Sequence, residues 1–267
     1  MSLSAYVGGL GVLGPGLANW QQAEAVLSGR QAYVPAPTVL PMPTILAAAE
    51  RRRTGRVVKL ALAIGSEAVS QAGMDPRTLA SVFSSSGGDG HNCHELCQAL
   101  SLAGREISPT RFANSVHNAA AGYWSIGTGA MVESTVLCAF DASFTAGLLE
   151  ALTQVVVDAA PVLLVAYDSE YPEPLHAKRP IPDAFGVAMV LTPQPSSTSL
   201  ARVDAALTEL SYDRMTDLAL EALRASFPAA RSLPLLRLLA EARGGSTILE
   251  YLDVSGLHVR IEPCPRP

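Results

Sequence analysis

Apolar and polar residues follow two different periods along the chain, and the changes of period mark the expected elements. Helical spacing is clearest over residues 57–72, where apolar side chains recur every three or four positions before Gly73. Continuous apolar runs at 80–83, 134–140 and 162–167 predict buried strands, and helices are expected at 17–27, 91–102, 119–126 and 144–157. Strands that alternate with helices predict an α/β fold with a buried sheet.

The two ends of the chain have their own patterns. Residues 6–11 predict a short strand entering a glycine turn, and the prolines of 35–43 exclude a helix or a central strand there. Strands are expected at 186–192 and 202–210 around the loop 193–199. Residues 217–243 are expected to be mostly helical, with breaks at Pro228 and Pro234, and 247–261 to form a hairpin. One compact unit is the expectation.

Composition narrows the class of protein. Hydrophobic residues make up 49% and charged residues 16% of the 267 residues, and the formal net charge is -5. A chain without a basic surplus is a poor binder of nucleic acid. The scarcity of charge indicates that some apolar surface is covered by a partner. We expect no transmembrane helix and no signal peptide, and therefore a cytoplasmic protein whose four cysteines are free thiols.

One stretch has the residue types of a metal site. His91, Cys93, His94 and Cys97 fall within one predicted helix, with the two cysteines at i,i+4. A closed zinc site normally needs four ligands in recognised pairs, and no second Cys/His pair occurs in the chain. We therefore expect neither a metal nor another cofactor, and keep a metal-binding regulatory domain as an alternative.

Residues 133–152 have the strand–turn–helix shape that positions catalytic nucleophiles. Cys138 falls inside the predicted strand, which favours an inert core thiol over a nucleophile. The turn itself holds Asp141, Ala142 and Ser143. Ser143 could attack in principle, and His117 is the histidine nearest to it in sequence, but the sequence does not pair them.

Several segments, taken in order, resemble the β-ketoacyl synthases, the condensing enzymes of fatty-acid and polyketide synthesis. YVGGLGVLGPGLANWQQAEAVLSGR resembles their first strand, glycine turn and helix, and VFSSSGGDG a later strand and turn. ISPTRFANSVHNAAAGYWSIGTG is similar to the approach to their dimer interface, and STVLCAFDASFTAGLLEAL to their nucleophile strand and elbow. The segments NSVHNAAAGYWSI and CAFDASF further resemble the short chain-length-factor subgroup of aryl polyene or xanthomonadin-type pathways.

The resemblance implies a thiolase-like layered fold (α/β/α/β/α). Its N-terminal half would be complete over residues 1–192, and a truncated C-terminal half, 193–267, would pack on it. It also places the family's catalytic cysteine at Asp141, with Ala142 one residue away and Ser143 two beyond. The family's two C-terminal histidines have no counterpart in a matching motif, since His258 lies in GLHVRIEP. Both catalytic functions are therefore expected to be lost.

The resulting prediction is a catalytically inactive ketosynthase-like subunit that pairs with an active ketosynthase, or with itself when none is present. An acyl carrier protein would reach it through that partner. The alternative enzyme is a self-sufficient 3-oxoacyl synthase or acyltransferase that uses Cys138 or Ser143. The resemblance implies that residues 134–140 lie at the sheet edge and pair with the other subunit. The predicted interface consists of Ala119, Gly122, Tyr123, Trp124, Thr135, Val136, Leu137 and Cys138.

Overall fold

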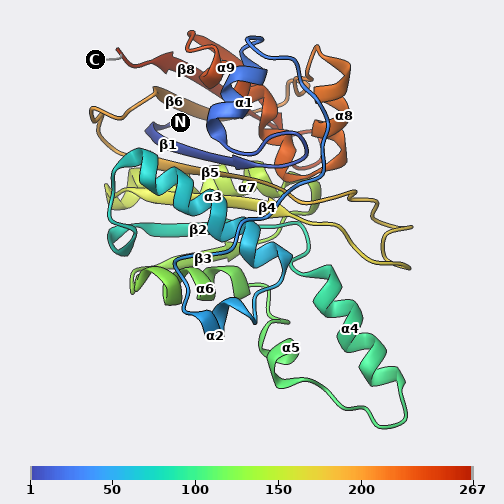
Figure 1. Cartoon of the computed structure of the whole chain (residues 1–267). Coiled ribbons are helices and arrows are strands. Elements are labelled where there is room, and N and C mark those ends of the chain that lie inside the picture. The colour runs from blue at the N-terminus through green and yellow to red at the C-terminus, as the bar shows by residue number, and fades with distance from the viewer. Residues whose placement is uncertain (1, 266–267) are drawn as a thin grey trace.

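The computed structural model describes residues 2–265, which fold around a mixed β-sheet (Figure 1). Its strands are β1 (Leu3–Leu13), β2 (Ala80–Ser84), β3 (Ser134–Leu137), β4 (Val162–Asp168), β5 (Phe185–Thr192), β6 (Ala201–Thr208), β7 (Gly245–Glu250) and β8 (Gly256–Pro263). Within the described residues the eight strands form one sheet in the order β3-β2-β4-β5-β1-β6-β8-β7. The expected α/β class is confirmed.

Strand β1 joins the two parts of the sheet. It pairs antiparallel with β5 from Tyr6 to Leu13 and with β6 from Leu3 to Val7. On the far side of β5, β2 runs parallel to both β3 and β4. The strands of the last third therefore continue the sheet of the first two thirds, and β3 and β7 are its two edges.

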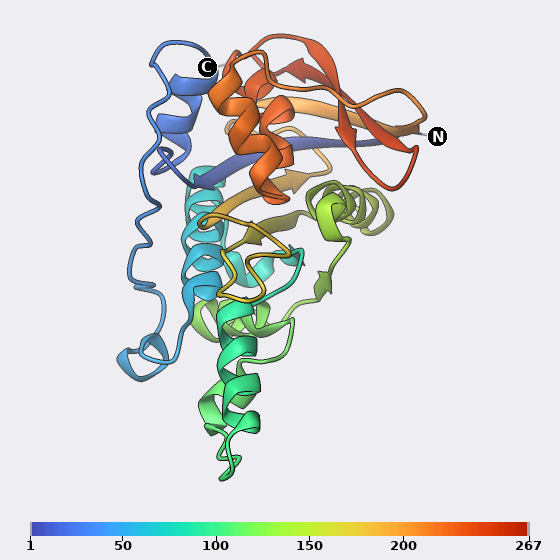
Figure 2. The ribbon, with the colours of Figure 1, turned by 90° about the vertical axis from the view of Figure 1, so that its right-hand side faces the viewer.

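Helices cover both faces of this sheet. They are α1 (Trp20–Leu27), α2 (Ala48–Arg51), α3 (Arg56–Ala72), α4 (Gly90–Ser101), α5 (Pro109–Ala113), α6 (Ala119–Thr128), α7 (Ser143–Asp158), α8 (Leu218–Ser226) and α9 (Leu233–Ala240), with 3-10 turns η1 (Pro76–Thr78), η2 (Phe140–Ala142) and η3 (Ala229–Ser232). One hydrophobic core lies under α3 and α6, and a second contains α1, α7, α8 and α9. Figure 2 shows α3 and α7 on opposite sides of the strands.

The glycines of β1 allow α3 to pack closely on the sheet. A Cβ atom on Gly9 would lie 2.2 Å from the Ala68 carbonyl oxygen, and one on Gly11 would lie 2.1 Å from that of Ile64. No side chain fits at such distances, because real Cβ contacts essentially never fall below 3.0 Å. The strand therefore runs through Gly8, Gly9 and Gly11 to Leu13, because these glycines make room for the helix, and the expected glycine turn follows it at Gly14–Leu17.

Helices α4 and α5, with the loop between them, form an arm that projects from the body; we call residues 90–113 the α4–α5 arm (Figures 1 and 2). In α4 the buried residues are Gly90 and Asn92, and α5 buries none of its five residues. Short helices depend on tertiary packing for their stability. The arm is therefore held by a small number of contacts.

Two sequence expectations need correction here. The strand predicted at 134–140 ends at Leu137, because the chain turns into η2 at Phe140 before α7 begins. Pro234 does not interrupt a helix but stands in the first turn of α9, where its missing N–H costs nothing.

A helical segment, Phe140–Asp158, is long and apolar enough to span a membrane by length and composition alone, whereas the sequence analysis expected none. Half of that window is buried inside the fold. Its residues Phe144, Leu148 and Leu152 belong to the core beneath β2 and β4, which explains why the helix is apolar.

Candidate functional site

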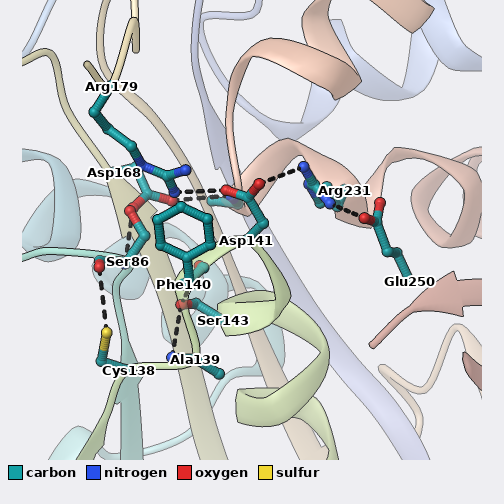
Figure 3. Close-up of polar contacts among 11 residues, drawn as sticks. Ser86, Cys138, Ala139, Phe140, Asp141, Ser143, Asp168, Arg179, Arg231 and Glu250 are labelled. Atoms are coloured by element: carbon teal, nitrogen blue, oxygen red, sulfur yellow. Dashed lines mark hydrogen bonds and ion pairs between the residues drawn. The ribbon is translucent and has the colours of Figure 1, made fainter. Parts of the chain in front are cut away.

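The turn between β3 and α7 is the elbow at which the sequence placed a nucleophile slot. Phe140 adopts a left-handed conformation with φ 51°, which is strained for a bulky side chain. The residue is 61% exposed, and its ring lies under the Arg179 guanidinium, with Cζ 3.8 Å from the ring centroid. The elbow thus presents a stacked Phe–Arg pair at the surface (Figure 3).

Asp141 is clamped between two arginines. Its Oδ1 lies 2.5 Å from Arg179 Nη2, and its Oδ2 lies 2.9 Å from Arg231 Nη2 (Figure 3). Arg231 also pairs with Glu250, whose other oxygen is 3.5 Å from Arg224. A chain of ion pairs therefore runs from the elbow into the C-terminal segment.

Asp141 does not cap α7, although an aspartate just before a helix often does. The N-cap of α7 is Ala142, and no side chain caps this end of the helix. Asp141 lies instead in η2, one residue earlier, where its carboxylate points to the guanidinium groups. An ionised carboxylate that is about one-third exposed gains more from two cations than from neutral amides.

Ser143 closes the elbow through its side chain. Its Oγ donates to the Phe140 carbonyl oxygen at 2.7 Å and accepts from the Ala139 N–H at 3.1 Å. The residue is buried, with 1% of its surface exposed. Both hydrogen bonds would have to break before this hydroxyl could attack a substrate. In this structure the hydroxyl stabilises the turn.

Cys138 is exposed, and the expectation of an inert core thiol is wrong for it. β3 ends at Leu137, so Cys138 lies in the turn and its side chain reaches the surface. Its Sγ donates to the Ser86 carbonyl oxygen at 3.2 Å. His117, which the sequence left open as a base, has its Nε2 3.3 Å from the Ser85 carbonyl oxygen.

Asp168 is a buried carboxylate at this site that the sequence analysis missed. It ends β4 and is 2% exposed. It accepts from the Ser86 N–H at 2.9 Å, from Ser86 Oγ at 2.5 Å and from the Ala229 N–H at 3.0 Å. Burial raises its pKa to about 6, against the opposing effect of these donors and of Arg179. The sequence did contain a signal for this buried carboxylate, because Asp168 is the single charged residue at the end of an otherwise apolar strand.

Asp168 gives the stability of the fold a pH dependence of known sign. Its pKa is about 6 in the fold, against 3.8 for an unperturbed aspartate, so the folded state holds the proton more tightly. This tighter proton binding stabilises the fold. The stabilisation is fully present below pH 3.8 and is lost as the pH rises through 6. We expect wild type to gain about 1 kcal/mol over Asp168→Asn between pH 7 and pH 5. Urea unfolding at both pH values measures this difference, and an unchanged difference would contradict it.

The predicted interface residues of α6 divide between the core and the surface. Tyr123 and Trp124, which the sequence analysis placed in the interface, are buried within this chain, Trp124 against Gly65 of α3. Gly122 is exposed and a Cβ there would meet open space, while Ala119 is half-buried. At Gly122 the exposed face of α6 therefore carries no side chain, which would let another surface approach the helix backbone closely.

The predicted interface residues of β3 lie at the sheet edge. Glu133 and Leu137 accept backbone hydrogen bonds from the β2 side, through Ser81 and Ser85. Backbone groups alternate along a strand, so those of Val136 face away from the sheet. Thr135, Val136 and Leu137 are half-buried. Contact with a partner remains a prediction for all these residues.

The metal candidates lie on the α4–α5 arm, away from the elbow (Figure 1). Cys93 and Cys97 are exposed, and His91 Nε2 is 3.6 Å from Glu170. Across residues 2–265, no group of three or more His, Cys, Asp or Glu side chains is placed to hold a metal ion.

Two cavities meet at the root of the arm. One of about 510 Å³ lies between α5 and α6 and is lined by Val116, Gly122 and Ile126 among others. The other, of about 540 Å³, includes Arg52, and both share Arg53 in their lining. The elbow residues Cys138, Asp141 and Ser143 line neither cavity.

Comparisons with known proteins connect this fold to one family. The family model described as the β-ketoacyl synthase N-terminal domain matches residues 18–241. A solved ketosynthase in complex with its chain length factor from Xenorhabdus doucetiae is similar, with 23% identity, a TM-score of 0.72 and coverage of 97% of this chain and 99% of that chain. A comparison with curated proteins gives no match.

Two further solved structures are similar with the same TM-score of 0.72. The ishigamide ketosynthase/chain length factor is 13% identical and is covered over 100% of its chain and 98% of this one. A type II PKS acyl-carrier protein in complex with its ketosynthase bound to the hexaketide gives 10% identity and coverage of 99% of this chain and 100% of that chain. These likenesses confirm the expected thiolase-like α/β fold. The five-layer order α/β/α/β/α is not seen in residues 2–265, because their strands form a single sheet with helices on both faces.

Proposed function

Because this chain belongs to the β-ketoacyl synthase N-terminal domain family, we propose that it is a catalytically inactive subunit of the chain-length-factor type. It pairs with an active ketosynthase and shapes the cavity in which an acyl chain on a carrier protein grows, as in aryl polyene-like pathways. The carrier protein reaches the pair through the ketosynthase, and the pair works in the cytoplasm.

The observation that carries this proposal is the clamped Asp141 at the elbow. Condensing enzymes need a thiolate that can form a thioester. Asp141 supplies a carboxylate whose two oxygens are taken by Arg179 and Arg231. Attack through it would cost both ion pairs, and Ser143 is committed to the backbone. These contacts support a structural role for the elbow residues and not a role as acyl carriers.

Pairing is supported by the edge strand β3. An exposed edge with unpaired backbone groups and no charged side chain is an aggregation hazard unless it is covered. Met131, Ile126 and Phe140 are exposed on the segments that flank it in sequence, at 94%, 62% and 61%. Two of the similar solved structures are described as ketosynthases with chain length factors. A ketosynthase of the same fold is the partner that suits this edge.

Cys138 favours a second candidate, an independent acyltransferase, because its thiol is exposed. Activation of a thiol requires a base within hydrogen-bond reach. The contact that Cys138 makes is with the Ser86 carbonyl oxygen, which cannot take its proton. This candidate therefore ranks second.

Intact-mass analysis separates the two candidates. After incubation with acyl thioesters, we expect no stoichiometric acyl adduct on this chain, while a co-purified ketosynthase should become acylated. Condensation should require both chains. An adduct that appears on wild type and disappears in Cys138→Ser would overturn the inactive-subunit proposal. Ser143→Ala serves as the matched control, since its hydroxyl is the other possible acceptor.

A further inference from the structure

The α4–α5 arm carries a pair of thiols that the proposed pairing does not use. Cys93 and Cys97 lie one helical turn apart on α4, and both are exposed. Burial and the neighbouring Cys97 together raise the pKa of the Cys93 thiol. The His91 side chain, two residues before Cys93, points to Glu170 and not to the cysteines. Although His94 lies between them on the helix, no group of three or more metal-ligating side chains forms there within residues 2–265, which leaves the two cysteines as a dithiol.

We propose that Cys93 and Cys97 form a reversible disulfide that loosens the α4–α5 arm. Helix geometry sets Cα atoms at i,i+4 about 6 Å apart, which is within the range of disulfides. Their Cβ atoms lie about 5–6 Å apart, whereas a disulfide needs about 4 Å. The bond can form only if the turn between the two cysteines tightens, so oxidation distorts this turn of α4.

The same turn holds the arm together. Asn92 Nδ2 donates to the Arg111 carbonyl oxygen at 2.8 Å, immediately before the first cysteine. Glu95, between the two cysteines, pairs with Arg111 at 3.3 Å. These contacts connect α4 to α5. Because α4 buries only Gly90 and Asn92, little core packing resists the distortion.

The chemistry is thiol–disulfide exchange with a small-molecule disulfide of the oxidised-glutathione class. The Cys97 thiolate attacks one sulfur of this disulfide, releasing one thiol and leaving a mixed disulfide on Cys97. Cys93 then loses its proton and attacks the Cys97 sulfur, which releases the second thiol and closes the bond. Cys93 has less thiolate because its pKa is raised, so it is the slower of the two to attack a disulfide in solution, but its attack on the Cys97 mixed disulfide is intramolecular.

Oxidation of the two cysteines would affect the proposed pairing surface by releasing α5. Thr110 and Ala113 of this helix line the cavity beside α6, together with Gly122 and Ile126. Loss of the contacts between α4 and α5 frees this wall of the cavity. This consequence for pairing rests on the proposed function, whereas the disulfide and the loosening of the arm do not.

Counting alkylated thiols tests the chemistry. Native protein in reduced glutathione should take up an alkylating reagent at up to four cysteines. After equilibration with excess oxidised glutathione, Cys93 and Cys97 should be protected from alkylation, with a peptide linked between them, whereas Cys138 should carry glutathione. Cys93→Ser and Cys97→Ser should each abolish that linked peptide, while the control Cys138→Ser should retain it. Oxidised wild type that shows only glutathione adducts, or links between chains, would overturn the proposal.

Limited trypsin digestion tests the loosening without any partner. Cleavage after Arg111 requires α5 to open, and the loss of one hydrogen bond and one exposed ion pair should speed it about tenfold in oxidised protein. Arg105, in the exposed loop, should be cut at the same rate in both states and serves as the reference. An unchanged rate after Arg111 in protein that contains the disulfide would overturn the loosening. If a ketosynthase bound neither the reduced nor the oxidised protein, that result would contradict the proposed function but not the disulfide or the loosening of the arm.

Discussion

Val136→Lys should weaken pairing with a ketosynthase at least about a hundredfold, because it places a charge on an edge strand that the partner must cover. Val136 lies in β3, the last strand on one side of the sheet, and its backbone groups point away from β2. Sedimentation velocity of the mixed subunits measures the affinity. The same change should prevent self-association when no ketosynthase is supplied.

Controls separate pairing from folding in this experiment. Val136 also packs on the core under α3, so thermal unfolding of the lysine variant must be compared with that of wild type. Val136→Thr keeps the branched shape and should pair as wild type does. Ser246→Lys places the same charge on β7, the opposite edge, and should have no effect. A well-folded wild-type chain that stays monomeric with and without a ketosynthase would contradict the pairing.

Asp141→Ala should lower the free energy of unfolding by about 2 kcal/mol, because it leaves Arg179 and Arg231 without the carboxylate that joins them. Loss of one partner from a fully buried pair costs about 3–5 kcal/mol. The expected effect is smaller here, since the Asp141 side chain is 34% exposed and water screens it. Urea denaturation measures the change.

The matched control is Asp158→Ala at the other end of α7, where the aspartate is exposed; it should change stability by less than about 0.5 kcal/mol. A double-mutant cycle with Arg231→Ala should show that the two losses are not additive, because both changes remove the same ion pair. If Asp141→Ala abolished product formation by the assembled pair while stability remained unchanged, Asp141 would have a role in catalysis and the clamp would not explain its presence.

The sequence by itself determined the fold class and the order of the main elements. Apolar periodicity placed α3 and α7 to within a few residues, and continuous apolar runs located β2 and β4, because burial on both faces leaves few polar residues in a central strand. The succession of motifs also indicated the family. The position of the turn between β3 and α7 followed from these motifs, and the resemblance predicts that Asp141 stands there in place of the family's nucleophile.

Only the tertiary structure decided what each side chain at the elbow contacts. The partners of Asp141 come from positions 179 and 231, and those of Asp168 from 86 and 229, and sequence periodicity carries no signal for contacts between such distant residues. Cys138 lies outside the core for a similar reason: whether a strand ends at Leu137 or at Phe140 depends on where β2 stops pairing with it. Local pattern reports which residues prefer burial, whereas long-range pairing and charge neutralisation determine which of them are buried, and against what.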